Sequence, residues 1–171
     1  MGKLSIRVRE GEDPMMVTDT GQLLRVLEKA ASDASSVTRP NMIDLTARNG
    51  DTLSIVVGGE ETVLGFTHGN GLPPYYASRG ASSEVHPVMT CYLHSAHHTE
   101  FPRHAVIARE SGLAAAVEFL HVEALPKCVP VRGLSANKCL QAPRGEPLSV
   151  VSLFFPPRAF AETRGRAGRM P

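Results

Sequence analysis

Several features that would place the chain in a specialised class are scarce or missing. Its 171 residues include no tryptophan, 5% aromatic residues and three cysteines. No apolar run approaches the roughly 18 to 20 residues that a helix needs to cross a bilayer. The N-terminal residues alternate like a strand and lack a secretory apolar segment. We therefore expect a cytoplasmic protein that does not associate with a membrane.

The cysteines are too few and too irregularly spaced for a stabilising framework. Cys91, Cys128 and Cys139 are odd in number and form no Cys-x-x-Cys pair, which argues against a set of disulfides and against a structural zinc cluster. Cys91 lies in the middle of an expected strand, where a buried, inert thiol is the common case. No serine sits in a Gly-x-Ser-x-Gly turn, and the glycine pairs precede neither a Lys-Ser/Thr pair nor a helix start. Nucleophilic catalysis and a phosphate-binding loop are therefore not indicated.

The small net charge of +1 conceals an asymmetry along the chain. Residues 1–130 carry 11 Lys and Arg against 15 Asp and Glu, a balance of −4, whereas residues 131–171 carry 7 against 2, a balance of +5. Specific nucleic-acid binding needs clustered basic residues to contact the phosphates, and the acidic first part has only scattered ones. The basic second part is suited at most to nonspecific contact with nucleic acid.

The composition changes after Pro130. Residues 131–171 are rich in Arg, Pro, Gly and Ala, and contain no Asp, Ile or Tyr. Such a segment is typical of a disordered or loosely packed tail. A second interpretation is that it replaces an ancestral C-terminus, for instance through translation of GC-rich DNA in a shifted frame. We therefore divide the chain into a domain at 1–130 and a basic tail at 131–171.

The sequence of the first part of the domain predicts a strand, a helix and a hairpin. Lys3–Val8 alternates apolar and polar residues as a half-buried strand does. Asp19 and Gln22 form a capping box ahead of a helix. Two apolar runs, Met42–Ala47 and Thr52–Val57, flank an Asn-Gly pair, which is a strong signal for a type I′ hairpin.

The sequence of the rest of the domain predicts further strands and a second helix. Thr62–Thr67, Val88–His94 and Arg103–Ala108 have the apolar and β-branched content of strands, and Ser111 is placed to cap a helix that runs through Leu120. Most of the expected strands follow one another along the chain, with one helix before them and one helix after them. This order is typical of an α+β domain. The expected fold is an antiparallel sheet of about six strands with helices packed on one face, followed by a poorly ordered C-terminal tail.

A cluster of histidines surrounds Glu100 in the sequence, made up of His94, His97, His98 and His104. Histidine, glutamate and cysteine are the residue types that bind zinc, and His98-Thr99-Glu100 matches the His-x-Glu half of the zinc-deaminase signature. The other half requires Pro-Cys-x-x-Cys, but Pro126-Lys127-Cys128 has an inserted lysine and no second cysteine. Because the signature is incomplete, we expect no metal or other cofactor. A zinc-dependent hydrolase or deaminase that uses His98, Glu100 and Cys128 is the alternative interpretation.

Carboxylates and tyrosines that are expected to be exposed indicate a different function. They are Glu60, Glu61, Glu100, Tyr75 and Tyr76. Tyrosines beside carboxylates are typical of a protein-binding face directed at a basic partner. The alternatives are that the tyrosines pack within a strand and that Glu100 accepts hydrogen bonds from loop amides. A third interpretation is a small-ligand-binding domain with a deep apolar pocket near Tyr75.

Several short motifs are informative through their order. Along the chain they are Gly58-Gly59 before a strand, Tyr75-Tyr76, Gly80, Thr99-Glu100-Phe101-Pro102, and an alanine-rich helix that closes on Glu118-Phe119-Leu120 and Leu125-Pro126. Over roughly residues 3–130 this arrangement resembles the Imm-one immunity proteins. These are encoded beside toxins of bacterial polymorphic toxin systems, commonly nucleic-acid deaminases. The tryptophan that the family tends to carry after its Leu-Pro segment, near Val131, is absent here.

The resemblance implies an α+β fold, no enzymatic activity, no cofactor, and inhibition of a cognate toxin by tight protein binding. The characteristic glutamate of the family falls on Glu100. Deaminase toxins act on nucleic acid and tend to have basic active-site rims, toward which an acidic partner is steered. The expected charge partners are Glu100, Glu60 and Glu61, the expected anchors are Tyr75 and Tyr76, and the expected scaffold residues are Phe101, Pro102 and Phe119.

Overall fold

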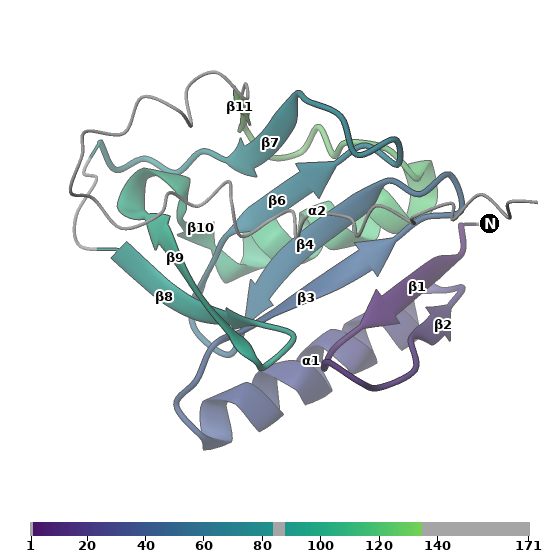
Figure 1. Ribbon diagram of the computed structural model, residues 1–171, viewed down its shortest axis with the longest axis horizontal. Helices are drawn as coiled ribbons and strands as arrows, with labels where there is room; N and C mark the ends of the chain where they lie inside the picture. The colour runs from purple at the N-terminus through teal and green to yellow at the C-terminus, as the bar shows by residue number, and fades with distance from the viewer. Residues whose placement is uncertain (1, 84–87, 135–171) are drawn as a thin grey trace, which may run out of the picture.

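The structure is a computed structural model that describes residues 2–83 and 88–134 (Figure 1). Its elements in chain order are β1 (Leu4–Arg7), β2 (Met15–Val17), α1 (Thr20–Ser36), β3 (Asn41–Thr46), β4 (Thr52–Val57), β5 (Glu61–Thr62), β6 (Leu64–Thr67), β7 (Tyr75–Ser78), β8 (Val88–Leu93), β9 (His97–Pro102), the 3₁₀ helix η1 (Arg103–Ala105), β10 (Ile107–Ala108), α2 (Arg109–Val122) and β11 (Val131–Leu134). The predicted tail and its possible origin in a shifted frame lie outside the described residues from position 135 onward.

Nine strands form one sheet. Their order is β11-β7-β6-β4-β3-β1-β2, and β8 pairs with β3 on one side and with β9 on the other. All of these pairs are antiparallel except β3 with β8, which is parallel. β5 and β10 form a separate two-stranded ribbon. The predicted antiparallel sheet is confirmed, but within the described residues it has nine strands where about six were expected.

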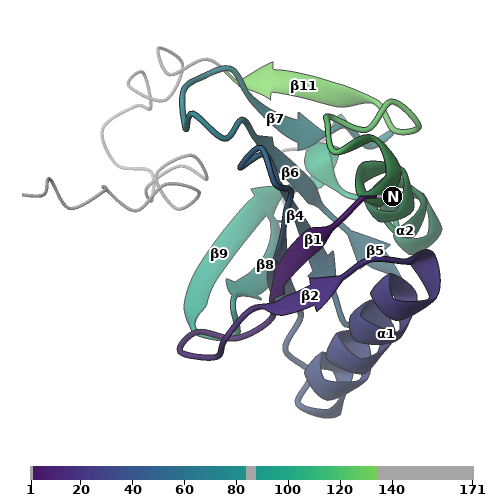
Figure 2. The same ribbon diagram turned by 90° about the vertical axis from the view of Figure 1, so that its right-hand side faces the viewer.

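Both helices cover the same face of the sheet (Figure 2). Side chains alternate between the two faces of a strand, and those of β1, β3, β4 and β6 that face the helices are apolar. They meet α1 and α2 in a buried core that includes Leu23, Leu27, Ile43, Ile55 and Phe119. A helix layer on one face of an antiparallel sheet is an α+β architecture, which confirms the predicted class.

The β8–β9 hairpin lies on the opposite face of the sheet (Figure 2). Its inward side chains Cys91 and Phe101 pack with Met42, Val56 and Val63 in a second apolar core. The predicted burial of Cys91 is confirmed, and this burial raises the pKa of its thiol to about 12. Only the first strand of the hairpin was predicted, so this second layer was not expected from the sequence.

The predicted N-terminal cap of α1 is present. Asp19 Oδ1 accepts the backbone N–H of Gln22 at 2.9 Å, which satisfies one of the free donors of the first helical turn. The Gln22 side chain accepts the backbone N–H of Thr18 at 3.1 Å, one residue before the position that a capping box uses. The cap therefore stabilises both the helix and the chain that enters it.

The predicted hairpin between β3 and β4 is confirmed, but its turn is not type I′. A type I′ turn needs a positive φ at both central residues, and only Gly50 has one, with φ of 86°. The N–H of Ala47 donates to the Asp51 carbonyl at 2.8 Å, and the N–H of Gly50 donates to the Ala47 carbonyl at 3.0 Å. These bonds close a three-residue loop that ends in a left-handed glycine.

Two elements near α2 differ from the prediction. The helix starts at Arg109 with Ala108 as an N-cap that makes no side-chain hydrogen bond, so Ser111 lies inside the first turn and does not cap it. The expected strand at Arg103–Ala108 is instead η1 followed by the two-residue strand β10. The predicted inward positions of α2 are correct, because Leu120 is buried and Leu113 and Val117 pack against the main core.

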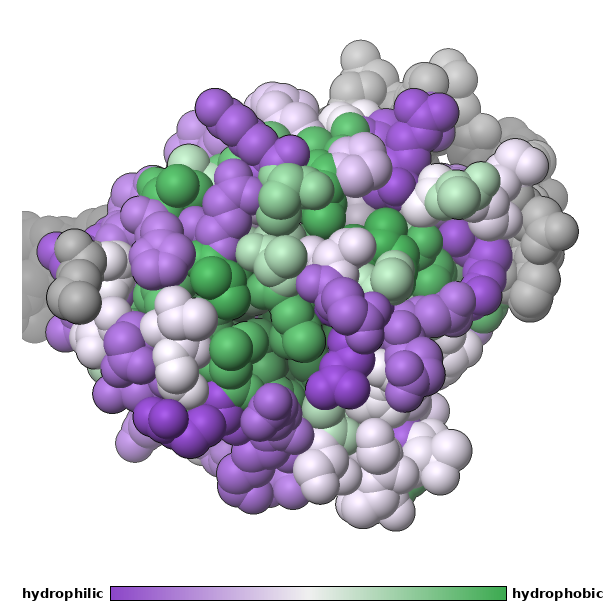
Figure 3. Space-filling model, turned by 180° about the vertical axis from the view of Figure 1, so that it is seen from behind, coloured by the Kyte–Doolittle hydropathy of each residue, from purple (hydrophilic) through white to green (hydrophobic). Residues whose placement is uncertain are grey.

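The described fold continues past the expected domain boundary. β11 pairs antiparallel with β7, placing Val131 opposite Ser78 and Gly133 opposite Tyr76. Residues 131–134 therefore belong to the sheet, although the sequence assigned them to the tail. Within the described residues no helix is long and apolar enough to cross a membrane. On the helix side, hydrophobic residues reach the surface among hydrophilic ones (Figure 3).

Candidate functional site

The β8–β9 hairpin presents Glu100 on its outer face. The two strands pair antiparallel, with Thr90 opposite Glu100. Thr99 and Phe101 are buried against the sheet, so the alternation of a strand directs His98 and Glu100 away from it. The predicted scaffold role of Phe101 fits this position, because its buried ring holds the strand that carries Glu100.

Polar contacts fasten the tip of the hairpin to the sheet. His94 Nε2 lies 2.9 Å from Asp44 Oδ2, and Ser54 Oγ donates to Asp44 Oδ1 at 2.6 Å. The backbone N–H of Ser95 donates to Asn41 Oδ1 at 2.7 Å. His94 and Ser95 both have left-handed backbone, with φ of 48° and 63°, which non-glycine residues adopt only when their surroundings hold them there. The tip therefore has one fixed position on β3.

Four side chains form a connected group on the outer face of the hairpin and beside it. They are called the hairpin patch and are Arg39, Tyr92, His98 and Glu100. The guanidinium carbon of Arg39 lies 3.7 Å from the centre of the Tyr92 ring, a cation–π distance. The rings of Tyr92 and His98 meet edge to face with centroids 5.7 Å apart. At the far end, His98 Nε2 lies 3.6 Å from Glu100 Oε1.

The Glu100 carboxylate is open to a partner. Its side chain is 41% exposed, and within the described residues it accepts no hydrogen bond and makes one ion-pair contact, with His98. The alternative in which loop amides bind Glu100 is therefore not seen in the described part of the chain. A carboxylate that keeps its hydrogen-bonding capacity is available to a cationic donor.

Glu60 and Glu61 lie on a different surface, at the β5–β10 ribbon. The Glu61 carboxylate accepts two hydrogen bonds from the Arg103 guanidinium, at 2.6 and 2.5 Å, a bidentate pair. Glu60 is exposed, and its carbonyl accepts the backbone N–H of Arg109 at 3.1 Å. Both glutamates line a groove of about 530 Å³ that Arg79 also lines. The charge of Glu61 is thus already matched within the protein.

The two tyrosines lie on β7 and point to opposite faces of the sheet. Tyr76 packs on the helix side against Phe66 and His68, with ring centroids 6.1 and 6.0 Å away. The Tyr75 hydroxyl donates to the Gly71 carbonyl at 3.1 Å. β7 does not pair with β9. The five predicted site residues therefore fall on three parts of the fold: β7, the β5–β10 ribbon and the hairpin.

The three residues of the zinc alternative are not assembled. His98 belongs to the hairpin patch, whereas the backbone N–H of Cys128 donates to Glu118 Oε2 at 2.9 Å beside α2. No group of three His, Cys, Asp or Glu side chains in the described ranges is arranged to hold a metal ion. The histidines that cluster in the sequence face separate carboxylates in space, such as Asp44 for His94 and Glu10 for His97.

Cys128 is expected to react slowly although it is exposed. Loss of solvent, together with the hydrogen bond to Glu118 and the negative charge of Glu118, raises the pKa of the Cys128 thiol to about 11. The thiolate is the reactive form, so modification by Ellman's reagent at pH 7.5 should be about tenfold or more slower than for a free cysteine. The rate should rise with pH up to the thiol's pKa.

A Cys139→Ser variant makes this measurement specific, because Cys91 is buried. In that background Glu118→Gln removes the charge that opposes ionisation of Cys128, and should speed the reaction at pH 7.5. A rate equal to that of a free cysteine, or no response to Glu118→Gln, would contradict the assigned environment.

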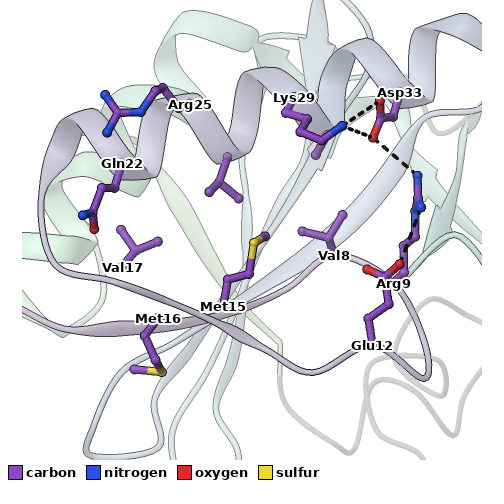
Figure 4. A pocket seen from close by; sticks show the side chains of 12 residues that line it. Val8, Arg9, Glu12, Met15, Met16, Val17, Gln22, Arg25, Lys29 and Asp33 are labelled. Atoms are coloured by element: carbon purple, nitrogen blue, oxygen red, sulfur yellow. Dashed lines mark hydrogen bonds and ion pairs between the residues drawn. The ribbon is translucent and has the colours of Figure 1, made fainter.

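A second concave surface lies between α1 and the β1–β2 ribbon (Figure 4). This groove, called the α1 groove, has a volume of about 890 Å³, and Met15 points into it from β2 (Figure 4). On its rim Arg9 pairs with Glu12 at 3.5 Å and Lys29 pairs with Asp33 at 3.2 Å. The rim charges are therefore largely matched to one another.

The hairpin patch as a group was not predicted. The sequence analysis singled out His98 as a metal ligand and Glu100 as a charge partner, but not Arg39 or Tyr92. The alternation of His98 and Glu100 with the buried Thr99 is the signal that was available. Arg39 gives no such signal, because its contact with Tyr92 depends on the parallel pairing of β3 with β8.

Comparison with known proteins assigns the chain to a family. No curated protein matches it. The profile of the family described as Immunity protein Imm1 matches residues 11–133, which is well over half of the chain. The match runs from the β1–β2 connection into β11 and so spans both helices and the hairpin. The resemblance drawn from the short motifs is thereby confirmed, and the chain belongs to the Imm1 family of immunity proteins.

Proposed function

We propose that this immunity protein neutralises a cognate toxin of the nucleic-acid deaminase class by direct binding and without catalysis. The observation that carries the proposal is the family match over residues 11–133, which includes nearly all of the described fold. An immunity protein acts on the toxin that would harm its own cell. On this proposal the protein works in the cytoplasm, where such a toxin meets nucleic acid.

The charge of the domain supports this class of partner. Residues 1–130 have a balance of −4, from 11 Lys and Arg against 15 Asp and Glu. A protein that acts on nucleic acid needs basic groups around its substrate groove. An acidic domain is steered toward such a groove, which raises the rate of association and disfavours neutral or acidic partners.

The candidate contact residues of this proposal are Glu100, Glu60, Glu61, Tyr75 and Tyr76. These residues differ in how freely their side chains can contact a toxin, because some of them already have partners within the protein. Glu100 and Glu60 are open carboxylates, whereas Glu61 would have to give up its two bonds to Arg103 before it could bind another cation. Tyr76 would have to leave its contacts with Phe66. Breaking a matched pair costs more than using an open group, so Glu100 and Glu60 are better charge partners than Glu61.

Co-expression with a toxin domain found encoded beside this gene tests the proposal. Cells that carry the toxin with an empty vector should stop growing, and cells that also carry this protein should grow. The two purified proteins should elute together as one complex in size-exclusion chromatography. A toxin variant without its catalytic residues should still form the complex, because binding does not require turnover.

Different outcomes refute different parts of the proposal. Growth arrest in the presence of this protein, or absence of a complex, would contradict neutralisation by binding. Uracil or inosine should accumulate in the nucleic acid of unprotected cells only. A toxin that kills without either product would refute the deaminase class and leave the immunity function standing. Turnover of a nucleoside by the purified immunity protein would refute the non-catalytic mechanism.

A further inference from the structure

We infer that the toxin docks on the hairpin patch, with a cationic side chain of the toxin at Glu100 and the Tyr92 ring beneath the contact. This inference rests on the proposed function, because it names the surface that performs it. It places the contact on the outer face of the β8–β9 hairpin, on the side of the sheet opposite to the helices (Figure 2).

The open carboxylate of Glu100 is the first argument for this surface. Several other acidic groups already accept hydrogen bonds within the domain: Glu61 from Arg103, Asp44 from Ser54, and Glu118 from the backbone N–H groups of Lys127 and Cys128. Glu100 accepts no hydrogen bond in the described residues, yet it sits on a strand and not on a free loop. A cation that reaches it breaks no hydrogen bond and competes only with the 3.6 Å contact from His98 Nε2, so most of the charge-assisted bond is gained on binding.

The second argument is the arrangement of Arg39 and Tyr92. Tyrosine and arginine are the residue types, with tryptophan, that carry the most binding energy in protein interfaces. Here the guanidinium lies over the ring at 3.7 Å, and the His98 ring makes a T-shaped contact with it at a centroid distance of 5.7 Å. Side chains already held in place lose little rotamer freedom when a partner arrives.

The third argument is the rigid support below the patch. Phe101 and Cys91 are fully buried in the second core. The tip is held by the contact of His94 with Asp44 and by the bond from Ser95 to Asn41. An isolated two-stranded hairpin is only marginally stable, but this one is docked along its inner face and at its tip. The outer face is therefore presented in one orientation.

The α1 groove is the rival surface. It is apolar at Met15 and Met16, which are 45% and 51% exposed, but nothing in its lining selects a basic partner. The two acidic groups on its rim, Glu12 and Asp33, are paired with Arg9 and Lys29. The difference lies in the carboxylates: Asp33 of the groove accepts hydrogen bonds from Lys29, whereas Glu100 accepts none in the described residues. Glu100 is therefore the better partner for a basic group of the toxin, and binding at the groove becomes an outcome of the test.

The test is a titration of the toxin domain with wild-type protein and single variants, by isothermal titration calorimetry. Glu100→Lys should weaken binding by about 30-fold or more, because it sets two cations against each other. Tyr92→Ala should weaken it by about 10-fold or more. The matched control is Glu28→Lys on the exposed surface of α1, which reverses the same charge on the other side of the sheet and should change the affinity by less than about threefold.

The readouts separate a lost contact from a lost fold. Each variant should keep the thermal midpoint of the wild type to within a few degrees, and a toxin variant with a basic residue changed to glutamate should restore binding to Glu100→Lys. Wild-type affinity in both Glu100→Lys and Tyr92→Ala would overturn the docking surface, as would a loss confined to Glu28→Lys. Absence of binding by the wild type in the same titration would instead refute the proposed function.

Discussion

Replacement of Phe101 by alanine is expected to lower the free energy of unfolding by about 3–5 kcal/mol. The ring is fully buried in the second core, where it packs with Met42, Val56 and Val63. Truncation removes its contacts and leaves a cavity that the hairpin cannot close, because its tip is held at His94. The loss is a large share of the roughly 5–15 kcal/mol by which domains are stable. Urea unfolding followed by far-UV circular dichroism measures it.

The location of the damage is also specific. Phe101 lies on β9, so hydrogen exchange of the β8–β9 amides should speed up more than that of β3 and β4. Phe101→Leu keeps most of the apolar volume and should lose only about 1 kcal/mol. The surface control is Leu72→Ala at a side chain that is 61% exposed, with an expected change within about 0.5 kcal/mol. An unchanged unfolding midpoint for Phe101→Ala would show that the hairpin is held by other contacts.

The elements with strong local signals were predictable. The alternation at Lys3–Val8 and the Asp19 cap identified β1 and α1, and the apolar runs around Asn49-Gly50 identified β3 and β4. Each of these depends on neighbours within a few residues. The turn type was wrong because an Asn-Gly pair also suits a loop in which only the glycine is left-handed.

β9 was not predicted because its polar composition obscures the two-residue alternation of buried and exposed side chains. His97–Pro102 contains two histidines, a glutamate and a proline, which resemble a polar corner, and only Thr99 and Phe101 are buried. The alternation was present, but the residues that face outward are unusually polar for a strand. η1 and β10 were merged into one expected strand because their boundary is set by Gly80, whose N–H donates to the His104 carbonyl at 2.7 Å. That contact joins distant parts of the chain.

The family motifs were predictable and the surface was not. Glu100 was identified from the Thr-Glu-Phe-Pro motif, and the family was identified from the order of such motifs. The group around Glu100 depends on the parallel pairing of β3 with β8, which brings the chain after α1 beside Tyr92. Pairings between strands that are distant in the chain leave no local pattern, so Arg39 had no signal in the sequence.

Gly80→Ala is expected to be the most damaging of the glycine substitutions among the family motifs. A Cβ atom at Gly80 would lie 1.9 Å from the backbone oxygen of Val106 and 3.0 Å from its carbon. Backbone atoms cannot move aside as a flexible side chain does, so the segment from η1 to β10 must shift. The expected loss is about 1–3 kcal/mol or more, again measured by urea unfolding. Because η1 directly follows β9, the shift should also loosen the hairpin.

Gly59→Ala is the matched control, and its expected sign is opposite. The nearest atoms to a Cβ at Gly59 are 3.8 Å away, and its φ lies outside the left-handed range. The methyl group therefore fits, and alanine reduces the freedom of the unfolded chain, which should stabilise the protein by up to about 1 kcal/mol. Equal effects of the two substitutions would contradict the close approach at Gly80. A loss at Gly80 alone would show that this glycine is kept for space and not for its backbone conformation.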